Sequence, residues 1–150
     1  MNKVEKFFKQ KNLPFTVQYM SESTATVDLA AAALGEKPER IAKTLSFQVK
    51  DDYIVVVFAG TARIDNKKYK HTFGAKAKML SAEQAIEYIG HPVGGVCPFA
   101  LPDNVKVYLD ESLLQFDYVY PAAGTPNSAV KMSPQELHAA TDGTWVEVSQ

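Results

Sequence analysis

The stretch Thr44–Phe58, TLSFQVKDDYIVVVF, decides the fold. Its two halves, 44–49 and 53–58, contain aromatic and β-branched residues, which are typical of strands. The polar residues Lys50–Asp52 lie between the halves, so we expect a turn there and a β-hairpin overall. Because residues 53–58 are apolar on both faces, that strand is expected to lie centrally in a sheet.

Helix and strand signals follow one another irregularly on both sides of this hairpin. Capping-box sequences predict helix starts at Ser81 and Ser133, and Gly35 and Gly90 are typical helix stops. We expect helices near residues 4–8, 26–35, 65–73, 81–90 and from 133 onward, helical turns at 38–41 and 110–114, and further strands at 15–20, 105–109, 118–122, 129–132 and 145–148. Several neighbouring strands are joined by short turns, which favours antiparallel pairing. The prediction is a mixed α+β fold around a curved, mostly antiparallel sheet.

Length and composition narrow the class of protein. The chain has 150 residues, which suits one domain, residues 1–150, with a real core. Its single cysteine excludes an internal disulfide framework. The N-terminal segment is amphipathic, so we expect no signal peptide, no membrane span and a cytoplasmic location.

The net charge of −1 conceals an uneven distribution. Residues 1–78 hold 14 Lys and Arg against 8 Asp and Glu, whereas residues 79–150 hold 2 against 9. The densest basic run extends from Arg63 to Lys78, with Asp65 as its one acidic residue. Such a run is suited to nucleic-acid phosphates, although a solvated helix face has the same composition.

Residues 88–99, YIGHPVGGVCPF, combine three glycines and two prolines within nine positions. Glycine and proline disfavour helix, so we expect a loop here. A glycine-lined loop with free N–H groups suits close approach to a carbonyl or phosphate oxygen. The alternative is an ordinary tight turn between a helix and a strand.

Three further sites carry candidate side chains. Cys97 with His91 as base would suit a thiol mechanism, but its position directly before Pro98 favours a structural, small apolar cysteine. Lys43, at the start of the first long strand, is either solvated or directed into a cleft. Asn127 and Ser128 offer small polar groups beside a turn, where turn chemistry alone also favours them.

Four short segments together resemble the YbaK family, which includes the editing domain inserted in bacterial prolyl-tRNA synthetases and its freestanding relatives. These segments are TVDLAAAALG at 26–35, IAKTLSF at 41–47, GGVCPF at 94–99 and NSAVKMSPQEL at 127–137. They occur in the family's order and span nearly the whole chain. The resemblance implies a barrel-like sheet and hydrolysis of the ester that joins a wrong amino acid to transfer RNA, typically proline tRNA.

The resemblance also implies roles for particular residues. The family's lysine maps to Lys43, and its G-x-x-x-P loop maps to Gly94, Gly95, Val96, Cys97 and Pro98. Expected substrate contacts are Thr44, Phe99, Asn127 and Ser128, and expected contacts to the tRNA backbone are Arg63, Lys67, Lys68 and Lys70. Freestanding relatives often carry serine in place of Cys97, and alanine-specific members carry a histidine where this chain has Ala122–Gly124. A thiol nucleophile and alanine specificity are therefore not expected.

The hypothesis is a metal-free deacylase without a cofactor. Main-chain N–H groups of residues 94–97 would polarise the ester carbonyl, and Lys43 would hold the terminal nucleotide. The expected partners are the acceptor end of mischarged tRNA and prolyl-tRNA synthetase, with neither DNA nor membrane. Two alternatives remain open at this point: a module that binds aminoacyl-tRNA or an amino acid without hydrolysis, and a thiol hydrolase built on Cys97 and His91.

Overall fold

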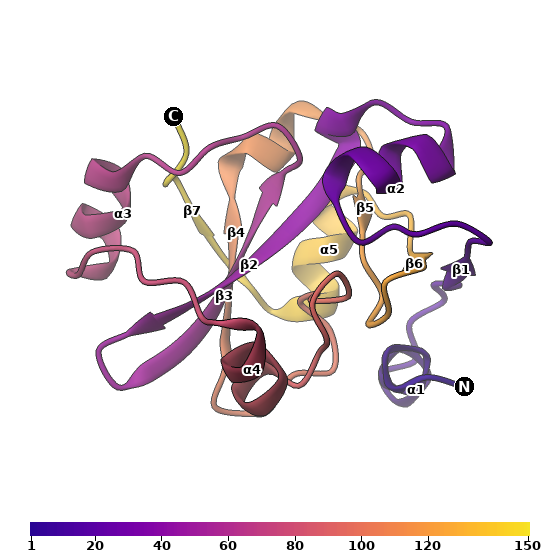
Figure 1. The fold of residues 1–150 in the computed structure, drawn as a ribbon, viewed down its shortest axis with the longest axis horizontal. Coiled ribbons are helices and arrows are strands. Elements are labelled where there is room, and N and C mark those ends of the chain that lie inside the picture. The colour runs from indigo at the N-terminus through magenta and orange to yellow at the C-terminus, as the bar shows by residue number, and fades with distance from the viewer.

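The computed structural model describes all residues, Met1–Gln150, and is built around one five-stranded sheet (Figure 1). The strand order is β5-β2-β3-β4-β7. The bounds of these strands are Ile41–Val49 for β2, Asp52–Ala59 for β3, Lys106–Asp110 for β4, Tyr120–Pro121 for β5 and Thr144–Val146 for β7. A separate two-stranded sheet pairs β1, Gln18–Tyr19, with β6, Ser128–Ala129.

The predicted hairpin is the centre of the sheet. β2 and β3 pair antiparallel from Ala42 opposite Ala59 to Val49 opposite Asp52. The three other pairings, β2 with β5, β3 with β4 and β4 with β7, are parallel. The mixed α+β class is confirmed, and antiparallel pairing holds for the longest ladder and for β1 with β6. It does not hold for these three neighbours, because long connections that contain helices bring them back in the same direction.

Five α-helices surround the sheet: α1 Lys3–Gln10, α2 Val27–Leu34, α3 Asn66–Phe73, α4 Ala82–Gln84 and α5 Pro134–Thr141. Three short turns accompany them: η1 Pro38–Arg40, η2 Ala85–Ile89 and η3 Glu111–Gln115. In Figure 1, α2 lies beside the start of β2, and α3 lies on the opposite side of the molecule. The longest helices have eight residues, so no helix is long enough to cross a membrane.

Local sequence explains where these helices begin and end. The predicted capping boxes are present, with Ser81 and Ser133 each accepting a hydrogen bond from the N–H of the third helical residue. A third box, Asn2 with Glu5, starts α1. The helix predicted over 81–90 changes after one turn into the wider η2 and ends at Gly90, whose φ is +88°.

The core lies on both faces of the sheet. On one face Ala42, Val57 and Ala59 pack with residues of α1 and α5. On the other, Phe47, Val56 and Phe58 pack with Tyr69 of α3 and with Val148. β2 is therefore covered at Ala42 on one face and at Phe47 on the other, whereas Lys43, Thr44 and Leu45 between them are half-buried.

Candidate active site

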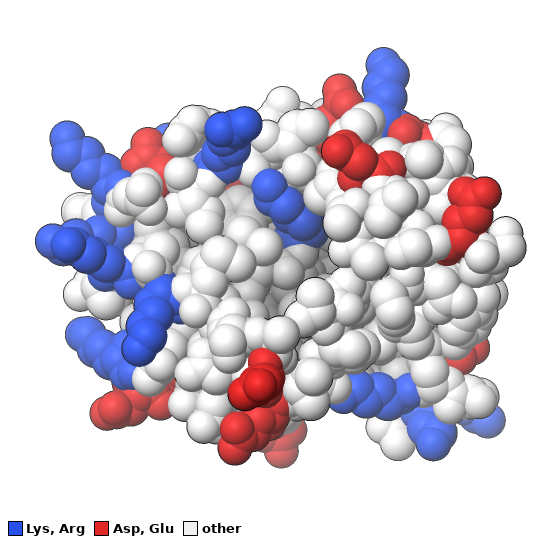
Figure 2. Space-filling model, in the orientation of Figure 1, with Lys and Arg blue, Asp and Glu red and all other residues white.

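A cavity of about 390 Å³ opens at the outer edge of β2. Its lining comes from Thr24–Val27 and Ala30 at the start of α2, from Met79–Ala82 and Ala85 around α4, from Val93, Gly94 and Val96, and from parts of β5 and β6. Figure 2 shows that this face of the molecule is hollowed near its middle, where most of the surface is uncharged. The size falls in the range of small-molecule sites, which are mostly apolar with a few placed polar groups.

Lys43 is the one charged residue that lines the cavity. Its Nζ donates a hydrogen bond to the carbonyl oxygen of Ala62 at 2.5 Å. Partial burial and, to a smaller extent, the nearby charge of Arg63 lower the pKa of Lys43. An ammonium group with one protein acceptor keeps two further N–H donors, and these are free for an anionic or carbonyl ligand.

The glycine-rich loop lies against the cavity. Gly94 and Val96 line it, and no protein group accepts from the N–H of either residue. Gly95 differs, because its N–H donates to Pro92 O at 2.9 Å. The expectation of free N–H groups from Gly94 to Cys97 is therefore corrected at Gly95, whose donor closes the turn.

Tight packing between loops explains why glycine is required at positions 94 and 95. Gly94 has a φ of +85°, and a Cβ there would lie 2.8 Å from Ala25 Cβ. A Cβ on Gly95 would lie 2.7 Å from the main-chain nitrogen of Thr125. Glycine is thus required for the approach of neighbouring backbone, and that packing fixes the loop against the cavity wall.

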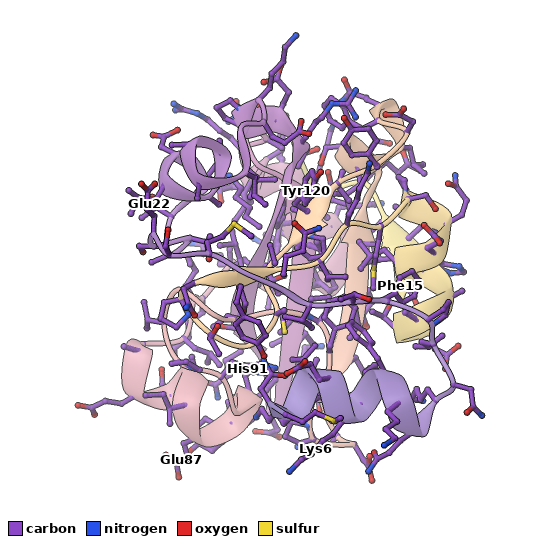
Figure 3. The ribbon with its side chains drawn as sticks, turned by 90° about the vertical axis from the view of Figure 1, so that its right-hand side faces the viewer. Lys6, Phe15, Glu22, Glu87, His91 and Tyr120 are labelled. Carbon is purple, nitrogen blue, oxygen red and sulfur yellow. The ribbon has the colours of Figure 1, made fainter.

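Cys97 and His91 do meet, but their chemistry does not suit a thiol nucleophile. Cys97 Sγ lies 3.5 Å from His91 Nε2, and both side chains are fully buried outside the cavity lining. His91 lies in the interior close to α1 (Figure 3). Its Nε2 donates to Phe99 O at 2.7 Å, so this nitrogen carries a proton and cannot accept one from the thiol. Burial raises the pKa of Cys97 to about 12 and lowers that of His91.

The remaining loop residues belong to the core. Pro98 and Phe99 are buried and do not line the cavity. The Phe99 ring packs edge-on against Phe8 of α1 with centroids 5.0 Å apart. Phe99 is therefore not retained as a substrate contact, and Pro98 has the role of directing the chain from the cavity wall into the core.

The small polar residues separate into two groups. Thr44 and Ser128 line the cavity, and the Thr44 hydroxyl is buried without a hydrogen-bond partner. The Ser128 hydroxyl is bonded to Thr125, 2.6 Å from its Oγ1. Asn127 is exposed and outside the lining, where its amide donates to Met20 O. Asn127 therefore stabilises the loop, and it is not retained as a substrate contact.

Two cavity walls were missed by sequence reasoning. Thr24–Val27 precedes and begins α2, and Met79–Ala82 precedes and begins α4. Neither segment carries side chains that suggest chemistry. The alanines at 30–33 were a usable signal for close packing, and Ala30 does lie at the cavity.

Basic side chains gather at one edge of the same face, over α3 (Figure 2). Arg63, Lys67 and Lys70 are exposed. Lys68 is engaged, because its Nζ lies 3.0 Å from Glu147 Oε1 and 3.0 Å from Ser149 O. Of the four predicted backbone contacts, Lys68 is thus the least available to a phosphate.

The buried thiol leads to a prediction about reactivity. We expect native protein to resist alkylation by iodoacetamide, because the thiolate is the reactive form and burial raises the pKa of Cys97 to about 12. Unfolding in guanidinium should expose one reactive thiol per chain, measured by mass spectrometry.

Cys97→Ser should change kcat/KM by less than about 3-fold, since the main-chain N–H stays in place. Complete inactivation by Cys97→Ser would instead support a thiol mechanism.

Known proteins are similar to this chain in sequence and in architecture. A family model described as "Aminoacyl-tRNA editing domain" matches residues 21–140. The chain is 44% identical over 150 residues to the Bacillus subtilis (strain 168) protein YwhH, covering 99% of this chain and 96% of that one. It is 27% identical over 131 residues to "Putative Cys-tRNA(Pro)/Cys-tRNA(Cys) deacylase EbsC" of Enterococcus faecalis, covering 86% and 80%. A solved structure described as "a putative trans-editing enzyme for prolyl tRNA synthetase" superposes with a TM-score of 0.90 at 28% identity, covering 99% of this chain and 95% of that one.

Proposed function

Because the chain belongs to the aminoacyl-tRNA editing domain family, we propose that it hydrolyses the ester of mischarged tRNA in trans, in the cytoplasm, without a metal ion or cofactor. The proposed substrate is proline tRNA that carries a small non-cognate amino acid. A relative is named "Putative Cys-tRNA(Pro)/Cys-tRNA(Cys) deacylase EbsC", and a structural neighbour is described as "a putative trans-editing enzyme for prolyl tRNA synthetase". Prolyl-tRNA synthetase is accordingly the proposed protein partner.

The observation that carries this proposal is a cavity with one cation and unpaired main-chain donors. Lys43 lies on one wall, and Gly94 and Val96, whose N–H groups have no protein acceptor, lie on another. An aminoacyl ester is already activated, so positioned water and stabilisation of the developing oxyanion are sufficient chemistry. Fixed N–H donors in a partly dehydrated site supply that stabilisation.

The proposed reaction uses these positions. Water attacks the acyl carbon, the carbonyl oxygen becomes an oxyanion, and the bond to the ribose oxygen breaks as that oxygen takes a proton. Gly94 and Val96 donate to the oxyanion, and Lys43 holds the terminal nucleotide through its two free N–H donors. No carboxylate or histidine lines the cavity, so we assign the orientation of water to the neighbouring ribose hydroxyl of the RNA.

The same lack of a side-chain base favours a second candidate, a module that binds aminoacyl-tRNA without hydrolysing it. One experiment separates the two. Purified protein, treated with EDTA, is incubated with tRNA charged with alanine, serine, cysteine or 2-aminobutyrate, and loss of ester is measured against the spontaneous rate. Accelerated loss supports the deacylase. Binding of charged tRNA without acceleration of any ester supports the binding module.

The basic surface on α3 gives a prediction about salt. Changing Lys67 and Lys70 together to alanine should weaken tRNA binding and reduce the slope of log Kd against log salt concentration by about 1 to 2, roughly one for each lost phosphate contact. Fluorescence anisotropy with labelled tRNA measures this slope. The matched control changes Lys6 and Lys9, which are exposed on α1. An equal effect in both double variants would indicate net charge rather than a docking surface.

A further inference from the structure

One strand edge forms a large part of the cavity wall. Six consecutive residues of β2, Ile41 to Ser46, line the cavity. Successive side chains of a strand point to opposite faces, so side chains alone cannot place all six in one cavity. The feature that these residues share is the main chain at the outer edge of β2, on the side away from β3.

That edge is paired on either side of Thr44 but not at Thr44 itself. β5 covers the edge up to Ala42, which lies opposite Pro121. Beyond the gap, Leu80 N–H donates to Ser46 O at 3.0 Å, and Gln48 N–H donates to Lys78 O at 2.9 Å. Main-chain groups of alternate residues point the same way in an antiparallel ladder, so the N–H and C=O of Thr44 also point outward. They face the cavity with no protein partner.

We propose that Thr44 pairs with the aminoacyl residue of the substrate as if that residue were one residue of an added strand. In an antiparallel ladder, two residues directly opposite each other exchange two hydrogen bonds. The substrate's α-amino group donates to Thr44 C=O, and its acyl carbonyl oxygen accepts from Thr44 N–H. This inference rests on the proposed function, and it specifies the substrate as an ester of an amino acid with a free α-amino group.

The composition of the cavity supports this assignment. Lys43 is the one charged residue in its lining, and no carboxylate is available to bind an amino group. A main-chain carbonyl is then the acceptor best placed for it. The acyl oxygen gains a third lone pair as it becomes the oxyanion, so it accepts from Thr44 N–H as well as from Gly94 and Val96. The gap is short, because Ala42 pairs with β5 on one side and the C=O of Ser46 accepts from Leu80 N–H on the other.

The test compares substrates on the unaltered protein. One proline tRNA is charged with 2-aminobutyrate and another with butyrate, which has the same carbon chain without the amino group. Each kcat/KM is divided by the spontaneous hydrolysis rate of that ester, because the amino group also changes intrinsic reactivity. We expect the normalised value to be about 10-fold higher for 2-aminobutyrate, the effect of one hydrogen bond to a polar group that is otherwise unpaired. N-acetyl-2-aminobutyrate should be poorer as well, since the acetyl group extends toward the paired end of the gap.

Equal normalised rates for 2-aminobutyryl and butyryl esters would overturn the inference while leaving the deacylase intact. A binding measurement tests the role of Thr44 independently of hydrolysis. Adenosine that carries 2-aminobutyrate in a stable 3′-amide should bind about 10-fold more tightly by calorimetry than its butyramide counterpart. If the protein binds the 2-aminobutyrate amide more tightly but hydrolyses no ester, the proposed function is refuted and the assignment of Thr44 is retained. Equal affinities for the two amides would refute the assignment of Thr44.

Discussion

Lys43→Ala should lower kcat/KM for deacylation by about 100-fold, because loss of the group that holds the terminal nucleotide lets the ester move by about 1 Å from its reactive position. Lys43 is the one cation in the cavity, and its remaining donors are free for the terminal nucleotide. The rate is measured on the best substrate of the charged-tRNA panel. Lys106→Ala is the matched control, because Lys106 is an exposed lysine on a strand of the same sheet and lies outside the cavity lining. Comparable losses in both variants would remove Lys43 from the mechanism.

The pH dependence supplies an independent test of Lys43. Burial lowers its pKa in the folded protein, so the ammonium loses its proton below the ordinary lysine value of 10.5. The kcat/KM is divided by the rate at which hydroxide hydrolyses the same ester without the protein. This ratio should fall as pH rises through the lowered pKa of Lys43. The unfolded chain binds more protons than the folded chain between the two pKa values, so the contribution of Lys43 to stability rises with pH across that window. Lys43→Ala should abolish both effects.

The sequence was most informative where local rules determine structure. The hairpin over residues 44–58, the helix caps at Ser81 and Ser133 and the stop at Gly35 depend on neighbouring residues, and all four appear in the structure. The directions of β4, β5 and β7 depend on how distant segments return to the sheet. No local pattern encodes that return, so the antiparallel expectation did not extend to them.

The candidate site likewise contains residues that the sequence predicts and features that depend on how distant segments meet. Lys43, Thr44, Gly94, Val96 and Ser128 were predicted and do line one cavity. Phe99 and Asn127 were predicted too, but a motif does not distinguish a residue that touches a ligand from one that holds the loop. The unpaired edge at Thr44 was beyond sequence reasoning altogether, because it arises from the position at which β5 ends and the segment around Leu80 begins.

Gly94→Ala should both destabilise the protein and lower kcat/KM, the latter by about 100-fold. A side chain at a φ of +85° is strained by roughly 1 to 2 kcal/mol. The new Cβ would also lie 2.8 Å from Ala25 Cβ and 3.3 Å from Pro126 Cβ, so the loop must move away from its neighbours. A displacement near 1 Å is sufficient for a 100-fold loss when catalysis depends on the position of N–H donors. Guanidinium unfolding and charged-tRNA assays measure the two effects.

Gly35→Ala is the control that separates strain from displacement. Gly35 has a φ of +66° at the end of α2, and a Cβ there would meet no atom within 4 Å. This variant should therefore lose only the roughly 1 to 2 kcal/mol of backbone strain, while its kcat/KM stays within about 3-fold of the original. Suppose instead that Gly94→Ala unfolds more readily yet hydrolyses the ester at the original rate. The N–H groups at 94–96 would then have no part in the reaction, and stabilisation of the oxyanion would have to be assigned to the edge of β2 alone.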